Sequence, residues 1–263
     1  MSLLAGAVTS ARALSPAVAL GAPGQSPSTV QVQATAPRMP PPPPPPVQPP
    51  SLRHGATLAG IVVGAQAWSR PHGGPHSGVK VWWVGTQTLW SGEPQVLLVL
   101  GSAMPAGRQW LKVLLPIRPD GATGWISRDN VVLLSTKYWI VVDKRTRQVR
   151  VYRGGRLEIT FPAVIGKPAT PTPDGLAAIY EKDPQSDPNG FIGSWALPLT
   201  ILSHVLYNFG GGPGRVAIHG RGGASLNDPL GSARSHGCIR LDNASAQWLA
   251  DHVPQGTPVQ ITG

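Results

Sequence analysis

The sequence predicts a mainly β protein in which a small N-terminal β-barrel-like domain precedes a larger β-sandwich with one or two short helices. Short β-branched runs alternate with Gly, Pro and Asp-Gly turn signals along most of the chain. The 263 residues include 32 glycines and 30 prolines, and only 13% of them are charged. This composition is typical of a loop-rich β protein with a non-globular stretch.

Residues 1–53 are expected to be a disordered N-terminal segment. Its start resembles a degraded signal peptide, with a short apolar stretch from Leu3 to Val8 but no basic residue in front of it. An unbroken proline run, Pro40 to Pro46, favours polyproline II and indicates a semi-rigid linker. A ligand for a proline-binding domain is the alternative interpretation of this run. Export is an expectation that this segment alone does not establish.

Residues 54–135 are predicted to form a small β-domain. Asp120-Gly121 supplies a hairpin turn between two of its strands. The strand candidates are VKVWWVG, QVLLVLG, QWLKVLLPI and TGWISRDNVVLL. The region resembles the SH3-like barrels of bacterial wall-associated modules. Trp110 and Trp125 are expected to pack the barrel core, which is the commoner fate of such side chains, and a binding groove is the alternative.

Residues 137–263 are predicted to form a second β-rich domain. It opens with two alternating runs that make a hairpin, with a turn near Lys144 to Thr146. One helix is expected over ASAQWLADHV, capped by Asp242 or Asn243. The other strand candidates are LEITFPAVIG, GLAAIYEK, GSWALPLTI, RVAIHG and PVQITG.

The chain is strongly basic, with a formal net charge of +10 and a pI of about 10.5. Such a surface favours polyanions, namely nucleic acid, an anionic membrane or an anionic cell-wall polymer. The basic residues are scattered, and the sequence carries no recognisable nucleic-acid-binding motif. We therefore expect anionic cell-wall polymers as partners, and no nucleic acid.

Cys238, the single cysteine, is a candidate nucleophile. A thiol attacks as the thiolate, so a neighbouring base must take its proton. His236 is near in sequence, but an i, i+2 spacing makes a good contact with the sulfur uncertain. We assign the base to His219, because a polar residue that ends the apolar strand RVAIHG can face a cleft. A backbone carbonyl beside His219 is the simplest partner for its second ring nitrogen.

The residues around Cys238 suggest further roles. Gly237 permits a tight turn, and the amides of Gly237 and Cys238 are expected to stabilise an oxyanion. Arg240 either binds a carboxylate of an anionic substrate or covers the surface as a solvated charge, and spacing alone does not decide between them.

Two alternatives to a nucleophilic site stay open at this point. His219, His236 and Cys238 could ligate a zinc ion, although the His-x-Cys spacing is shorter than in the usual zinc motifs. All three could instead be structural, with the thiol serving as a small buried apolar group. If Cys238 acts as a nucleophile with His219 as its base, no metal and no organic cofactor is required, and we expect none.

The strings HG at His219 and SHGCIRL from Ser235 to Leu241 resemble the signature of the L,D-transpeptidases, the YkuD-type catalytic domain. The resemblance covers roughly residues 137 to 262. It implies a β-rich fold with Cys238 as nucleophile and His219 as proton donor and acceptor. It also implies that the Gly220 carbonyl orients His219. The other positions it assigns are His236 and Gly237 in the catalytic motif, and Ser235 and Arg240 in substrate binding.

The same resemblance implies an activity on peptidoglycan stem peptides. Enzymes of this family attack the carbonyl of the third, diamino-acid residue of a donor tetrapeptide and release D-alanine. They then pass the acyl group to a side-chain amine of another stem, which makes a 3-3 cross-link. The alternatives are an L,D-carboxypeptidase, in which water takes the acyl group, and a non-catalytic wall-binding protein. The expected location is the cell wall or another extracytoplasmic space, and the oligomeric state stays undetermined.

Overall fold

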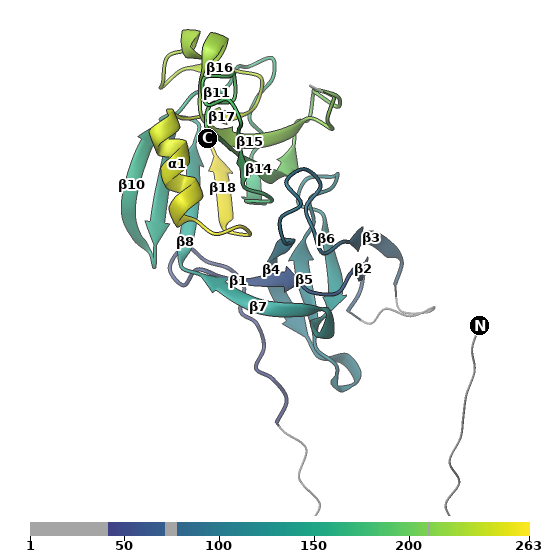
Figure 1. Ribbon diagram of the computed structural model, residues 1–263. Coiled ribbons are helices and arrows are strands. Elements are labelled where there is room, and N and C mark those ends of the chain that lie inside the picture. The colour runs from purple at the N-terminus through teal and green to yellow at the C-terminus, as the bar shows by residue number, and fades with distance from the viewer. Residues whose placement is uncertain (1–41, 72–77, 210) are drawn as a thin grey trace, which may run out of the picture. The chain divides into compact units, whose positions relative to one another are not determined.

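The computed structural model describes residues 42–71, 78–209 and 211–263. The segment that resembles a signal peptide and the first prolines of the proline run lie outside these residues. Strands dominate the part that is described, which holds one α-helix and three short 3-10 helices (Figure 1). The predicted mainly β fold class is confirmed.

The described residues between 56 and 136 form a seven-stranded sheet. Its strands neighbour one another in the order β3-β2-β6-β5-β4-β1-β7. They are β1 (Ala56–Ile61), β2 (Ala65–Trp68), β3 (Lys80–Val84), β4 (Val96–Ala103), β5 (Trp110–Leu114), β6 (Thr123–Ser127) and β7 (Val131–Thr136). The 3-10 helices η1 (Pro105–Gly107) and η2 (Arg128–Asn130) lie between strands. The likeness of this region to SH3-like barrels stays a prediction.

Aliphatic side chains fill the core of this sheet. Along β5 and β6, Leu111, Val113 and Ile126 point inward and are fully buried. Trp110 and Trp125 are half-buried, and they alternate with these inward residues. Successive side chains of a strand face opposite sides, so the two tryptophans lie on the outer face. The expectation that they pack the barrel core is wrong.

The end of the predicted N-terminal segment contacts the seven-stranded sheet. The Val47 amide donates a hydrogen bond of 2.8 Å to Ser102 Oγ, and Gln109 Nε2 donates one of 3.2 Å to the Pro45 carbonyl. The Val47 side chain packs against the aliphatic core. The prediction of a non-globular segment up to residue 53 therefore does not hold for its last part.

Residues 138–262 form three further sheets. A five-stranded sheet has the order β10-β9-β8-β18-β12, a four-stranded sheet β13-β14-β15-β17, and β11 pairs with β16. The first sheet contains β8 (Tyr138–Asp143), β9 (Gln148–Arg153), β10 (Arg156–Pro162), β12 (Gly175–Ala178) and β18 (Pro258–Thr262). The others contain β11 (Ile165–Gly166), β13 (Asp183–Pro184), β14 (Trp195–Leu202), β15 (Arg215–His219), β16 (Ala233–Ser235) and β17 (Ile239–Arg240). The third 3-10 helix is η3 (Gly223–Asn227).

The helix α1 (Asn243–His252) packs on the core that the five-stranded and four-stranded sheets share. Asp242 caps its start, because the carboxylate accepts a 2.8 Å hydrogen bond from the Ser245 amide. Leu249 faces the shared core, and Trp248 meets Phe161 edge-on with ring centroids 5.7 Å apart. The predicted helix and one of its two predicted caps are confirmed.

A smaller apolar cluster joins the two β-rich regions. Leu58, Leu98 and Leu114 of the seven-stranded sheet pack with Ala178 of β12. The Glu181 carboxylate, fully buried, accepts a 2.8 Å hydrogen bond from Thr88 Oγ1 across the same boundary. Within the described ranges, no helix has the length and apolar composition that crossing a membrane requires.

Candidate active site

His219 ends β15, an inner strand of the four-stranded sheet. β15 pairs with β14 on one side and with β17 on the other, so two strands fix the backbone at His219. The side chain is only 4% exposed. A histidine in this position has a fixed ring and little contact with water.

Hydrogen bonds select the tautomer of His219. Its Nδ1 lies 2.7 Å from the Gly220 carbonyl oxygen and 3.2 Å from that of Ile192. Both partners are acceptors, so Nδ1 carries the proton and Nε2 keeps a free lone pair. Burial, assisted by the positive charge of Arg240, lowers the pKa of His219 from 6.5 to about 4. The ring is therefore neutral at pH 7 and able to accept a proton at Nε2.

The strand register brings Cys238 to the same face as His219. β15 and β17 run parallel, with His219 opposite Arg240 and Ile218 opposite Ile239. One residue earlier, Cys238 falls beside Ala217, and this register agrees with the Ala217 amide being one of the groups that lower the pKa of the thiol. From the spacings of a β-sheet, the Cα atoms of Cys238 and His219 are roughly 8 Å apart, with both side chains on one face.

The Cys238 thiol is neutral at rest. Its side chain is half-buried, and the surrounding protein desolvates it enough to raise its pKa above the usual value. The Ala217 amide and the charge of Arg240 lower that pKa, but burial is the larger effect. A neutral thiol thus faces a neutral imidazole, and the thiolate must be made when it is needed.

Ser235 braces the turn that presents Cys238. Its hydroxyl donates a 2.6 Å hydrogen bond to the Cys238 carbonyl and accepts one of 3.0 Å from the Gly237 amide. Gly237 has φ +119°, in the region that favours glycine. Because the Gly237 amide is already bonded inside the turn, its predicted place in an oxyanion hole is wrong. The Cys238 amide is the remaining backbone candidate.

Two threonines support this turn from behind, and sequence reasoning missed both. Thr172 Oγ1 accepts a 2.9 Å hydrogen bond from the Gly166 amide and donates one of 2.8 Å to the Gly237 carbonyl. Thr170 Oγ1 donates 3.2 Å to the Ser235 carbonyl. The string KPATPTP could have indicated this role. Threonines between prolines directly after a strand cannot continue the sheet, so their hydroxyls are free to hydrogen-bond a neighbouring segment.

His236 lies apart from this buried arrangement. It is exposed, and its ring stacks on Phe209, with the centroids 5.7 Å apart and the planes 29° from parallel. The described part of the chain contains no group of three or more His, Cys, Asp or Glu side chains arranged to hold a metal ion.

Arg240 is buried, with 3% of its surface exposed. Its guanidinium pairs with the Asp228 carboxylate and lies 4.8 Å from the centre of the Phe191 ring. The alternative of a solvated surface charge is therefore wrong. Ser235 is also fully buried. Neither residue presents a solvent-accessible polar group to a substrate. Arg240 instead places a positive charge near both Cys238 and His219.

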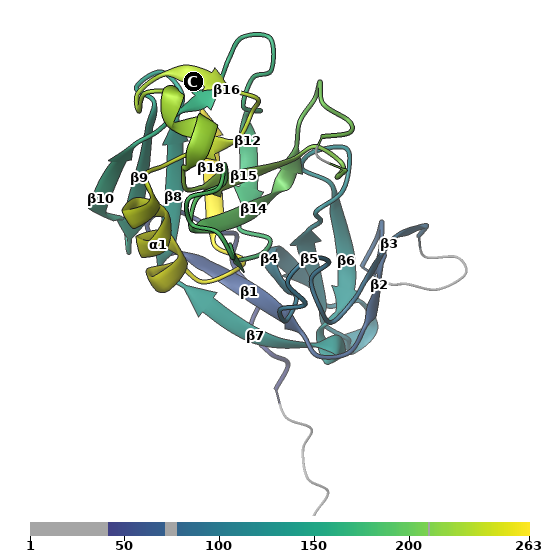
Figure 2. The ribbon, with the colours of Figure 1, turned by 45° about the horizontal axis from the view of Figure 1, so that its top comes forward.

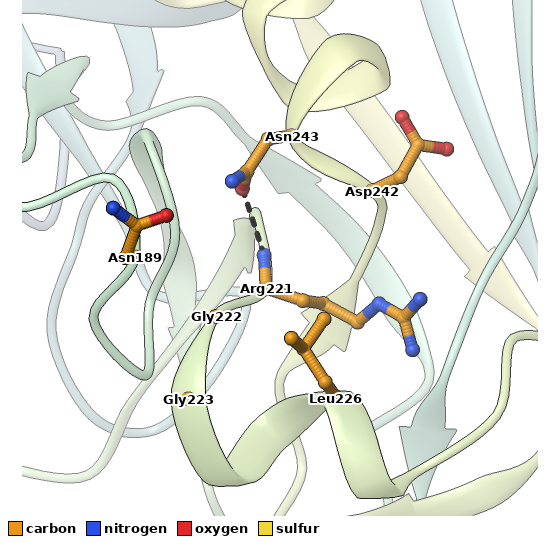
Figure 3. Close-up of a pocket in the computed structure, with 7 residues that line it drawn as sticks. All are labelled: Asn189, Arg221, Gly222, Gly223, Leu226, Asp242 and Asn243. Carbon is orange, nitrogen blue, oxygen red and sulfur yellow. Dashed lines mark hydrogen bonds between the residues drawn. The ribbon is translucent and has the colours of Figure 1, made fainter.

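A pocket of about 330 Å³ adjoins the His219 end of β15. Figure 3 shows the residues that line it, which are Asn189, Arg221, Gly222, Gly223, Leu226, Asp242 and Asn243. Asn243 Oδ1 accepts 3.0 Å from the Arg221 amide and 3.1 Å from the Ser194 amide. A Cβ on Gly220 would come within 2.2 Å of that oxygen. Asn243, expected only as a cap, thus fixes the backbone that carries the Gly220 carbonyl.

The family model and the curated relatives point to the same family. The model of the L,D-transpeptidase catalytic domain, YkuD, matches residues 137–261. A Bacillus licheniformis protein named "Putative L,D-transpeptidase YkuD" is 36% identical over 158 residues, which cover 57% of this chain and 86% of the relative. The Bacillus subtilis protein of that name is 30% identical over 156 residues, covering 56% and 84%. The solved structure of L,D-transpeptidase 3 from Mycobacterium tuberculosis, with a faropenem-derived adduct, has a TM-score of 0.39 at 17% identity, covering 64% of this chain and 91% of that one.

Proposed function

The chain belongs to the L,D-transpeptidase family, and from that premise we propose that it is a peptidoglycan L,D-transpeptidase with Cys238 as nucleophile. Enzymes of this family act on peptidoglycan stem peptides. The observation that carries the proposal is the parallel register of β15 and β17, which supports a single face shared by the thiol and the His219 imidazole.

Acylation begins with proton transfer from Cys238 Sγ to Nε2 of His219. The sulfur attacks the carbonyl carbon of the third residue of the donor tetrapeptide, and the carbonyl oxygen becomes an oxyanion. The Cys238 amide and the positive charge of Arg240 are the groups proposed to stabilise it. The C–N bond to the terminal D-alanine then breaks, and His219 returns the proton to the leaving amine. The product is a thioester on Cys238.

Deacylation reverses the proton path. The side-chain amine of a second stem attacks the thioester carbonyl and gives a proton to His219 Nε2. The C–S bond breaks, and His219 protonates the departing thiolate, which restores the neutral pair. The new amide bond is the 3-3 cross-link. The carbonyls of Gly220 and Ile192 hold the His219 ring in one orientation through both steps.

The net positive charge of the chain supports a location in the cell wall. A net charge of +10 suits an enzyme that works among anionic polymers. We therefore propose that the protein is exported and acts in the cell wall, with anionic cell-wall polymers in contact with its surface.

Product analysis tests the proposed function. The protein would be incubated with a purified disaccharide-tetrapeptide, and the products separated and weighed by mass spectrometry. We expect a 3-3 cross-linked dimer together with free D-alanine. Trimmed tripeptide without any dimer would replace the proposal with an L,D-carboxypeptidase. Equal product from Cys238→Ala would exclude Cys238 as the nucleophile of either enzyme. No product from the parent protein would leave the non-catalytic wall-binding protein.

A further inference from the structure

The segment between β14 and β15, residues 203–209 and 211–214, borders the Cys238 turn and is here called the β14–β15 segment. Val205, Tyr207 and Phe209 of this segment are exposed, although they are large apolar side chains. Phe209 stacks on His236, two residues before Cys238. The segment therefore offers an apolar surface next to the thiol.

The turn that joins β5 to β6 holds the start of this segment. Asp120 Oδ1 accepts a 2.8 Å hydrogen bond from the Leu202 amide, the last residue of β14. Asp120 Oδ2 lies 2.8 Å from Nε2 of His204. The Asp120 side chain is 11% exposed, so its bond to the Leu202 amide is partly screened from water, whereas the His204 side chain is 61% exposed. Figure 2 shows the turn beside the segment.

The same turn also holds the middle and the end of the segment. Arg118 Nη2 donates 3.0 Å to the Pro213 carbonyl, and the guanidinium carbon lies 4.3 Å from the centre of the Tyr207 ring. Just beyond the segment, Arg215 Nη2 donates 2.9 Å to the Pro116 carbonyl. β15, which ends at His219, thus begins at a residue bonded to the β5–β6 turn.

Among its described residues, the other hydrogen bonds of the β14–β15 segment lie within the segment. Ser203 Oγ accepts from the amides of Val205 and Leu206, and Phe209 and Gly212 exchange backbone hydrogen bonds of 3.0 Å. These bonds stay within the segment, so they shape it without fixing its direction. Its contacts with the rest of the protein are the anchors that Arg118 and Asp120 provide and the stacking of Phe209 on His236.

We propose that Arg118 and Asp120 are positioning residues for acyl-donor binding, acting through the β14–β15 segment. The inference rests on the proposed function, because it concerns the same substrate. The exposed faces of Tyr207 and Phe209 would contact the part of the donor that does not react. Without the anchors, only a fraction of molecules presents this surface. The donor KM then rises by the inverse of that fraction, while kcat, set by Cys238 and His219, changes little.

Steady-state kinetics and amide hydrogen exchange of the full chain test this proposal. For Asp120→Ala and for Arg118→Ala, we expect the KM for the disaccharide-tetrapeptide to rise about fivefold to tenfold, with kcat within about twofold. Amides of the β14–β15 segment should exchange faster in both variants. Asp129→Ala is the matched control, because Asp129 is an exposed aspartate of the same sheet region, and among the described residues its side chain is hydrogen-bonded by Ser127. It should leave KM and exchange unchanged.

A conservative variant separates positioning from simple loss of folding. Asp120→Asn keeps an oxygen for the Leu202 amide, so it should restore most of the donor KM and of the exchange protection. An unchanged KM in Asp120→Ala, or a fall in kcat alone, would overturn the proposal, as would unchanged exchange in the segment. If the parent protein makes no product, the proposed function has failed. Two measurements then still decide whether the β5–β6 turn positions the β14–β15 segment. They are the amide hydrogen exchange of the segment and the rate at which iodoacetamide alkylates Cys238.

Discussion

Thr172 offers the sharpest test of how the Cys238 turn is held. Its side chain is 1% exposed, and its hydroxyl joins the Gly166 amide to the Gly237 carbonyl. Thr172→Val keeps the shape and removes the hydroxyl, so one buried donor and one buried acceptor lose their partner. At about 1–3 kcal/mol for each of the two unsatisfied groups, the free energy of unfolding should fall by about 2–6 kcal/mol.

The same substitution should slow the chemistry, because Gly237 directly precedes the nucleophile. A displacement of the reacting sulfur by part of an ångström is enough to slow acylation about tenfold or more. Urea unfolding followed by tryptophan fluorescence measures the first effect. The rate at which a carbapenem acylates Cys238, followed by intact mass, measures the second.

Two matched variants make the Thr172 result interpretable. Thr172→Ser retains the hydroxyl and should keep acylation close to that of the parent, losing about 1 kcal/mol of stability with the methyl group. Thr170→Val removes a single 3.2 Å bond from a half-buried residue and should cost about 1 kcal/mol or less. If Thr172→Val unfolds at the same urea concentration as the parent and is acylated at the same rate, the Thr172 hydroxyl does not hold the Cys238 turn.

Three further predictions concern the residues around the thiol. The pKa of His219 is about 4 in the folded protein and 6.5 in the unfolded chain, so its contribution to stability is complete above pH 6.5 and is lost as pH falls toward 4. Over that range the free energy of unfolding of the parent should drop by about 3 kcal/mol because of His219. His219→Gln should lack this part of the drop, and urea titrations at both pH values measure it. Gly237→Ala should destabilise by about 1–3 kcal/mol, because φ +119° is strained for alanine, and a normal melting temperature would contradict this. Asn243→Ala leaves the Arg221 and Ser194 amides without their acceptor and should cost about 2–4 kcal/mol and slow acylation; chemical unfolding and intact mass check both.

Local pattern was sufficient for much of the fold. The turn near Lys144 to Thr146 follows from two alternating runs, and the structure has β8 and β9 on either side of it. The helix α1 was predictable because its cap and its apolar face lie within a dozen residues. β16 and β17, with three and two residues, carry no period of their own. They exist because distant strands supply their partners, and no local sequence signal reports that.

The candidate site divides in the same way. Cys238 and His219 were proposed from their chemistry and from the strand that His219 ends, and their roles stay predictions. The roles of Thr172 and Asn243 depend on contacts between segments that are far apart in the sequence, 65 residues for the bond from Thr172 to Gly237. The setting of Arg240 depends on Asp228 and Phe191, which the sequence around the cysteine does not reveal.

The central claim is that one neutral thiol, Cys238, receives the acyl group with His219 as its base. The most direct measurement is intact and peptide-resolved mass spectrometry of the protein mixed with the disaccharide-tetrapeptide donor in the absence of an acceptor. We expect a single acyl adduct on Cys238, accompanied by stoichiometric release of D-alanine, and a strongly reduced rate in His219→Gln. D-alanine released without a covalent adduct on Cys238, or an adduct that forms equally fast in His219→Gln, would contradict it.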